Sequence, residues 1–204
     1  MPGQPVNNST TKHPVEDKSH QAPNSPCDDE RMAISPENAN VHLPAGIALR
    51  RPAEHDHAAV VGVIIDWWNL PGTAHLPTLL PRLFFQHFSD TSFIAEDSAG
   101  LAGFLIGFRS ASQPHVAYIH FVGVRPDLRN AGLARALYET FFAESRAAGC
   151  HRVNAITGVG NRGSQAFHSA MGFEPTGDTE IDGVLGWRDY DGPGEHRVAF
   201  TRAI

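Results

Sequence analysis

Residues 118–141 carry the clearest structural pattern in this chain and read Tyr-Ile-His-Phe-Val-Gly-Val-Arg-Pro-Asp-Leu-Arg-Asn-Ala-Gly-Leu-Ala-Arg-Ala-Leu-Tyr-Glu-Thr-Phe. Its first part, Tyr118 to Val124, is apolar enough for a buried strand, and apolar residues recur at helical spacing from Leu133 onward. Between them lies a basic turn, Arg125 to Gly132. Such a turn presents successive backbone N–H groups at a helix N-terminus, where phosphate and pyrophosphate groups bind. The stretch therefore predicts a strand, a phosphate-binding turn and an amphipathic helix.

The first residues of the chain differ in composition from the rest. Met1 to Pro44 contains seven prolines and no aromatic residue. Such a segment cannot bury enough apolar area to offset the entropy lost on ordering. We therefore expect a disordered tail over residues 1–44 and one domain over residues 45–204, which is long enough for a full hydrophobic core.

Charge and composition exclude several classes of protein. The net charge of −6 lacks the basic field of a nucleic-acid binder. No lysine follows Lys18, which excludes a Schiff-base lysine and a Walker-type phosphate loop inside the domain. No apolar run approaches membrane-spanning length, and two isolated cysteines form neither a disulfide framework nor a metal cluster. We expect a cytoplasmic protein without a metal, nucleic-acid or membrane partner.

The remaining elements are predicted from hydrophobic periodicity and turn residues. Predicted strands are Ala48–Arg50, Ser92–Glu96, Ala102–Arg109, Val116–Val124, Arg152–Thr157, Phe173–Pro175 and Arg197–Arg202. Predicted helices are Glu54–Trp68, Thr78–Phe88, Leu133–Ala148 and Gly163–Met171.

Two motifs in this order resemble those of the GNAT superfamily of N-acetyltransferases. Arg129-Asn130-Ala131-Gly132-Leu133-Ala134 resembles the Arg-x-x-Gly-x-Gly/Ala acetyl-CoA loop, and Asn161 to Phe173 resembles the Asn…Phe-Tyr…Gly-Phe motif. The resemblance covers the chain from about Ala45 onward. It implies an α/β (α+β) GNAT fold, in which a central mixed, mostly antiparallel twisted sheet of six to seven strands is flanked by about four helices.

The resemblance also implies acetyl-CoA as acyl donor and the residues that bind it. Loop N–H groups would hold the pyrophosphate with Arg129, and with Arg125, as charge complement. The strand after Tyr118 would bind the pantetheine arm, and a bulge would splay it from the strand of Arg152 to Thr157. The implied cofactor residues are Phe121, Val122, Gly123, Val124, Arg129, Asn130, Ala131, Gly132, Leu133, Ala134, Asn161 and Ser164.

In this family the amine attacks the thioester directly, which implies a base, an oxyanion donor and an acid. Tyr118 and His120 alternate on their strand and point to one face, so His120 is a candidate base. Glu96 competes with it for this role, and the Val124 N–H would hold the oxyanion. His168 stands where the family usually has the tyrosine that protonates the sulfur. It is a candidate acid, although its reach and pKa differ from those of a phenol.

The predicted activity is acetyl transfer to a primary amine of a small molecule. Aromatic and carboxylate side chains on the flanking segments suit a cationic amine: Trp67, Trp68, Asn69, Phe84, Phe85, His87, Asp189, Asp191 and Glu195. A noncatalytic acetyl-CoA-binding module and a protein N-terminal or lysine acetyltransferase remain as alternatives. A homodimer is left open, since dimers are common in the family.

One further motif favours a different class. Gly158-Val159-Gly160-Asn161-Arg162-Gly163 has the form of the Gly-x-Gly-x-x-Gly dinucleotide fingerprint. A Rossmann half needs further βαβ units after it, however, and the segment up to Ile204 reads mainly as turns. The sequence therefore disfavours nucleotide binding at these glycines.

Overall fold

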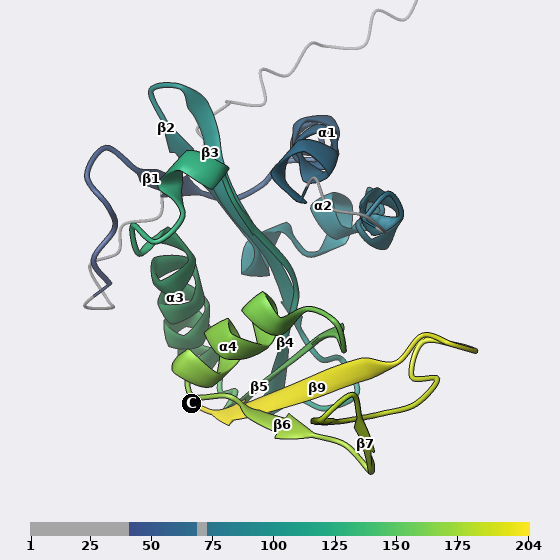
Figure 1. The fold of residues 1–204 in the computed structure, drawn as a ribbon. Coiled ribbons are helices and arrows are strands. Elements are labelled where there is room, and N and C mark those ends of the chain that lie inside the picture. Colours follow the sequence, from purple (N-terminus) through teal and green to yellow (C-terminus); the bar gives the residue numbers. More distant parts are fainter. Residues whose placement is uncertain (1–40, 69–72) are drawn as a thin grey trace, which may run out of the picture. The chain divides into compact units, whose positions relative to one another are not determined.

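The predicted fold class is confirmed by a computed structural model, which describes residues 41–68 and 73–204. The described chain contains a seven-stranded sheet, four α-helices and a separate two-stranded hairpin (Figure 1). Residues 1–40 of the predicted tail lie outside the described residues. Within 41–44, Leu43 packs against the hydrophobic core.

The central sheet is mixed and mostly antiparallel, as expected. Its strand order is β1-β2-β3-β4-β5-β9-β6. Only β4 and β5 pair in parallel among the described strands, because the helix that follows β4 carries the chain back to the start of β5. The strands are β1 (Ala48–Arg50), β2 (Phe93–Asp97), β3 (Gly100–Arg109), β4 (Val116–Val124), β5 (Arg152–Gly158), β6 (Glu174–Thr176) and β9 (Arg197–Ala203).

Helices cover both faces of this sheet (Figure 1). On one face lie α3 (Leu133–Ala147) and α4 (Arg162–Ala170), and on the other lie α1 (Asp56–Trp68) and α2 (Leu83–His87). Each layer encloses its own cluster of buried side chains. The stripe Leu133, Leu137 and Phe141 of α3 is fully buried in the first cluster, as its i, i+4, i+8 spacing predicts.

The predicted helix Thr78–Phe88 is wrong as a single element. The segment forms a 3₁₀ turn, η2 (Leu76–Leu79), and then the short helix α2. Pro81 explains the division, because proline lacks the backbone N–H and disfavours helical geometry in the residue before it. Leu80, at φ −122° and ψ 67°, has left the helical region accordingly.

A hairpin between β6 and β9 was missed by the sequence reading. It consists of β7 (Thr179–Ile181) and β8 (Val184–Gly186), joined by Asp182 and Gly183 at φ 51° and 77°. Two left-handed residues are what a type I′ turn requires, and Asp-Gly is a typical sequence for it. After this hairpin and the loop behind it, β9 returns antiparallel to β5, so no parallel βαβ unit follows the glycines from Gly158.

Candidate active site

Strands β4 and β5 stop pairing before either of them ends, and the interval between their unpaired segments is called the slot below. Their parallel ladder joins Val116–Ile119 to Arg152–Ala155, and within the described residues it goes no further, although both strands continue. The separation starts at a β-bulge: Ile106 pairs with Phe121 but Gly107 pairs with Ile119, which leaves His120 as the extra residue. A bulge bends its strand and increases the local twist, so the expected bulge and splay are both confirmed.

The edge of β4 that faces this slot carries backbone N–H groups that do not point toward β3. The N–H of Arg125 donates to the carbonyl of Ala102 on β3. Because ladder bonds alternate along a strand, the N–H groups of Val122 and Val124 point away from β3, into the slot. The predicted pantetheine-binding segment therefore directs two backbone donors away from β3, on the side of β5.

The predicted pyrophosphate loop leads directly from β4 to α3. After a 3₁₀ turn, η4 (Pro126–Leu128), the chain takes left-handed backbone angles at Asn130 (φ 64°) and Gly132 (φ 90°). Gly132 is the N-cap of α3, and its lack of a side chain makes the positive φ inexpensive. No side chain caps this helix in the described chain, so its first N–H groups stay available to an anion.

Both loop arginines have hydrogen-bond partners within the protein. Arg125 forms ion pairs with Asp97 at 2.5 Å and with Asp127 at 2.8 Å, which offset its charge. Arg129 turns back toward the sheet: its guanidinium donates to the carbonyl of Trp67 and, at 3.4 Å, to that of Val124.

The second motif forms the start of α4. The Asn161 side chain accepts the N–H of Ser164 at 3.0 Å, which makes it the N-cap of the helix. Asn161 is exposed and Ser164 half-buried, and they follow the end of β5 that borders the slot. The two predicted cofactor motifs thus come from the strands on either side of one opening.

His120 is fixed by the bulge against the α1/α2 layer. Its Nε2 lies 2.6 Å from the carbonyl oxygen of Leu79, and its ring stacks on Phe84 with centroids 4.3 Å apart. A carbonyl only accepts, so Nε2 carries the proton and Nδ1 keeps its lone pair. Burial lowers the pKa of His120 below 6.5, although the Leu79 bond and the charge of Asp191 oppose this shift. The imidazole is therefore neutral at pH 7.

Tyr118 lies on the same face as His120, as predicted. It stacks on Phe108 and pairs across the sheet with Asn154, which in turn pairs with Thr201. Asn154 and Thr201 are joined by a hydrogen bond of 3.0 Å, and all three side chains of this row are half-buried. The row forms a polar floor next to His120.

The loop before β9 faces this floor. Burial raises the pKa of Tyr118, and the nearby Tyr190 and Asp191 raise it further. Arg197, the first residue of β9, holds the loop by donating to Asp191 at 2.7 Å and to Glu195 at 2.9 Å. Arg197 lies opposite Gly158 on β5, beside the slot, and the sequence reading did not single it out.

His168 lies in the core between α3, α4 and β9. Its ring stacks on Phe200 with centroids 4.7 Å apart, and the residue is 5% exposed. Nδ1 donates to the Ser164 carbonyl at 2.8 Å, so Nε2 accepts from the Tyr138 hydroxyl at 3.2 Å. Burial lowers the pKa of His168 below 6.5. Both nitrogens are thus occupied by neighbours on α3 and α4, and Tyr138 was not foreseen as a partner.

Glu96 is engaged elsewhere. Its carboxylate accepts two hydrogen bonds from Arg50, at 2.6 and 3.0 Å, and Arg50 also binds Asp56 at 2.7 Å with both terminal nitrogens. This network joins β1, β2 and the start of α1. The structure does not bring Glu96 together with Tyr118 and His120.

The aromatic residues predicted to flank the acceptor divide into two groups. Trp67 and Phe85 are buried, and Trp67 stacks on Phe104. Trp68 and Phe84 are half-buried and contact residues of the site, Phe121 and His120 respectively. His87 is exposed, and Asn69 lies outside the described residues.

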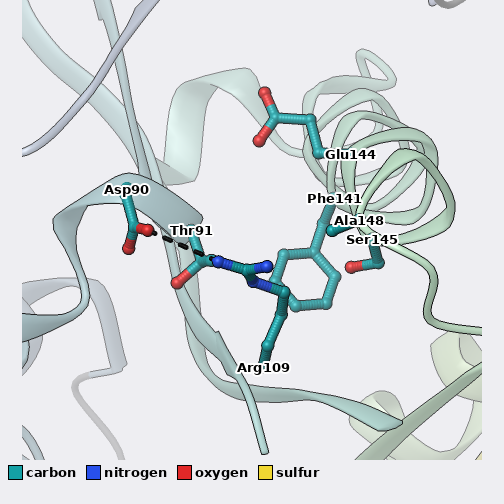
Figure 2. A pocket seen from close by; sticks show the side chains of 7 residues that line it. All are labelled: Asp90, Thr91, Arg109, Phe141, Glu144, Ser145 and Ala148. Atoms are coloured by element: carbon teal, nitrogen blue, oxygen red, sulfur yellow. Dashed lines mark ion pairs between the residues drawn. The ribbon is translucent and has the colours of Figure 1, made fainter. Parts of the chain in front are cut away.

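A shallow pocket of ≈ 170 Å³ lies apart from these residues (Figure 2). It is lined by Asp90, Thr91, Arg109, Phe141, Glu144, Ser145 and Ala148. The guanidinium of Arg109 lies 3.8 Å from Asp90, and the two side chains are 49% and 71% exposed, so this ion pair contributes little. None of the predicted site residues lines the pocket.

The described residues lack two further features. They contain no group of three or more metal-ligating side chains suited to an ion. They also contain no helix long and apolar enough to cross a membrane.

Comparison with known proteins identifies the kind of fold. The model of the acetyltransferase (GNAT) family matches residues 61–173. A search of curated protein sequences finds no match.

Several solved structures share the fold. Ard1 from Thermoplasma volcanium is 16% identical, with a TM-score of 0.59 over 78% of this chain and 99% of that chain. The ribosomal-protein-S18-alanine N-acetyltransferase from Escherichia coli is 18% identical, with a TM-score of 0.55 over 78% and 94%. The diaminobutyrate acetyltransferase EctA from Paenibacillus lautus, solved with L-2,4-diaminobutyric acid and coenzyme A, is 21% identical, with a TM-score of 0.54 over 76% and 93%.

Proposed function

The chain belongs to the GNAT family of acetyltransferases, and from this membership we propose that it transfers an acetyl group from acetyl-CoA to the primary amine of a small molecule. One observation supports the proposal most. Strand β4 leaves β5 at the bulge, turns two N–H donors into the slot, and leads through Gly132 to the uncapped N-terminus of α3. This continuous series of donors suits a pantetheine arm followed by a pyrophosphate.

The residues of the donor site fit acetyl-CoA. The space beside Gly132 is open, since a Cβ there would meet no atom within 4 Å, and the α3 N-terminus favours an anion. Val122 and Val124 would pair with the arm as with an added strand, and Asn161 and Ser164 border it from α4. Bound acetyl-CoA supplies the thioester carbonyl that the amine attacks.

His120 is the proposed base. Direct attack needs a neutral amine, and the Nδ1 lone pair of a neutral His120 can take its proton, directly or through one water. The Leu79 carbonyl fixes the tautomer and the Phe84 stack fixes the ring plane, so Nδ1 is the nitrogen left for this task. Glu96 would have to leave Arg50 to compete, which makes it the weaker candidate.

The oxyanion and the leaving thiolate need separate groups. A slot-facing N–H, that of Val124, is placed on the strand that would carry the thioester, and such a donor stabilises charge that develops during attack. His168 keeps the family position of the acid, but it must release the Tyr138 hydroxyl before Nε2 can serve another partner.

The acceptor is proposed to lie on the floor of Tyr118, Asn154 and Thr201. Phe84 bounds this floor on the side of α2, and the loop of Tyr190 and Asp191 bounds it on the side of β9. Hydroxyl, amide and carboxylate groups around an aromatic wall suit a small polar amine with a cationic character. Acidic or neutral amines would be poorer acceptors.

Binding and turnover test the proposal together. Titration calorimetry should show that acetyl-CoA and CoA bind the purified full chain, whereas NAD(P)H does not. A thiol-release assay over a panel of polyamines, amino acids, aromatic amines and peptides should then identify acceptors among small cationic amines. Activity on peptides alone would overturn the small-molecule assignment. Binding of CoA without turnover of any amine would instead indicate a noncatalytic module.

A further inference from the structure

The Arg129 side chain bridges two backbone carbonyls on different layers of the domain. Its guanidinium donates to the Trp67 carbonyl on α1 and, at 3.4 Å, to the Val124 carbonyl at the end of β4. Arg129 itself belongs to the loop that leads into α3. One side chain thus connects the donor loop, the slot strand and the opposite helical layer.

Arg129 brings positive charge to the last described turn of α1. The carbonyls of a helix's last turn have no intrahelical partner and carry the negative end of the helix dipole. Within the described helix, the last turn of α1 contains no basic residue but does contain Asp66, whose charge has the unfavourable sign there. Arg129 is the cation that the structure places on one of these carbonyls.

The same end of α1 packs beside the bulge. Trp68 meets Phe121 edge to face with ring centroids 5.5 Å apart, and Phe121 follows His120 directly. Gly123 makes this approach possible, because a Cβ there would lie 2.6 Å from the Phe104 ring and 2.7 Å from that of Trp68. A displacement of the α1 end would therefore shift the residues around His120.

We propose that Arg129 is a positioning residue: its side chain is a strut that links the conformation of the loop between β4 and α3 to the position of the α1 end. Because the α1 end packs against Phe121, the strut also links this loop to the residues around His120, where the acceptor is proposed to bind. The cofactor-dependent part of this inference rests on the proposed function of the loop. When an anion orders the loop, the strut holds the α1 end in place, so the donor and the acceptor favour each other's binding. Thermodynamic linkage requires that effect to be reciprocal.

Hydrogen exchange of the full chain tests the strut with a readout other than activity. Arg129→Gln removes the guanidinium. Arg135→Gln removes another exposed arginine, the third residue of α3, and serves as a control for lost charge near the loop. Without any ligand, amides of Ile64–Trp68 should exchange about tenfold faster in Arg129→Gln, the effect of losing one charge-assisted hydrogen bond. They should exchange at the wild-type rate in Arg135→Gln.

Added CoA tests the coupling. CoA should slow exchange at Ile64–Trp68 in the wild type and in Arg135→Gln, but not in Arg129→Gln at CoA concentrations that saturate it by calorimetry. Tryptophan emission gives a second reading, because Trp67 and Trp68 are the two tryptophans that remain in a Trp187→Phe background. The Arg129→Gln variant should also raise the acceptor KM about tenfold.

The outcomes separate the two proposals. Wild-type exchange at Ile64–Trp68 in unliganded Arg129→Gln would overturn the strut, and weaker CoA binding alone would make Arg129 a simple pyrophosphate ligand. If the wild type fails to bind CoA, the proposed function falls. The comparison of unliganded variants would still decide whether Arg129 holds the end of α1.

Discussion

The Nε2 atom of His120 lies 2.6 Å from the carbonyl oxygen of Leu79, and this bond ties the bulge of β4 to the end of η2. The bond has a chemical consequence, because it fixes the proton on Nε2 and leaves Nδ1 basic. It also has a structural one, because the side chain of the extra residue is anchored to the helical layer that covers the opposite face from α3.

Replacing His120 should remove the decrease in activity at acidic pH. Because the His120 pKa is lowered below 6.5, kcat/KM of the wild type should be flat near neutral pH and fall tenfold per pH unit below that lowered pKa. His120→Gln keeps a donor toward Leu79 but no base, so it should lose about 10²–10⁴-fold in kcat and show no acid limb.

His115→Gln is the matched control for this experiment. His115 is an exposed histidine that precedes the same strand. Its replacement should leave the pH profile in place. An unchanged acid limb in His120→Gln would assign the base to another group.

Glu96→Gln should lower stability and spare turnover. The neutral amide weakens the two hydrogen bonds from Arg50, a loss of about 1–3 kcal/mol in the free energy of unfolding. Denaturant unfolding measures this change, and kcat is then determined at a temperature where the variant is fully folded. If kcat falls by two orders of magnitude or more under those conditions, Glu96 takes part in the chemistry.

Gly132→Ala should impair the donor loop through its backbone. Its φ of 90° lies in the left-handed region, where a Cβ costs about 1–2 kcal/mol. We expect a lower melting temperature and weaker CoA binding by calorimetry, both because the loop relaxes away from this angle.

Gly62→Ala should have the opposite effect on stability, although the space for an added Cβ is open at Gly62 as it is at Gly132. Gly62 lies in α1 without a positive φ, and an added Cβ meets no atom within 4 Å. Alanine there should stabilise the protein by about 0.5–1 kcal/mol and leave CoA affinity unchanged. Equal behaviour of the two variants would refute the role given to Gly132.

The buried pair of His168 and Tyr138 should make stability depend on pH. The pKa of His168 is lowered in the folded state, so the unfolded chain binds more protons between that pKa and 6.5. Stability should therefore decrease as pH falls below 6.5, by up to about 1.4 kcal/mol per pH unit from this residue.

A double variant isolates that contribution. His168→Phe with Tyr138→Phe removes both polar partners together and keeps the aromatic packing against Phe200. Its stability should fall less steeply below pH 6.5 than that of the wild type, as measured by urea unfolding at pH 7.5, 6.0 and 5.0. Equal slopes would show that His168 is protonated as easily in the folded protein as in the unfolded chain.

Sequence patterns were sufficient for the elements whose periodicity is strong. The bounds predicted for β4 match the structure, and those for α3 differ by one residue, because a continuous apolar strand and a clear helical stripe leave little ambiguity. Two local signals in the sequence account for the differences. Pro81 explains why the predicted helix is divided, and Asp182-Gly183 explains the turn of the hairpin that was not predicted.

The arrangement of the site depended on contacts that no local pattern contains. Leu79 contacts His120 through a carbonyl, which every residue possesses, so its identity gave no signal. Tyr138 on α3 forms a hydrogen bond with His168 on α4, and Arg50 on β1 forms one with Glu96 on the neighbouring strand β2. The sequence could name candidate groups, but it could not say which of them were already bound to a neighbour.

Strands β6 and β9 are neighbours in the sheet, yet residues 177–196 separate them in the chain. A tight turn would be enough to join Thr176 to its partner Ala199, so this segment is not needed to complete the ladder. The segment is nevertheless part of the domain, because Ile181 is 6% exposed within the same core cluster as Leu137 of α3, and Val184 packs against that cluster. Its exposed part, with Tyr190 and Asp191, lies beside Tyr118, so single substitutions there should alter the choice of amine while the core contacts of the segment stay in place.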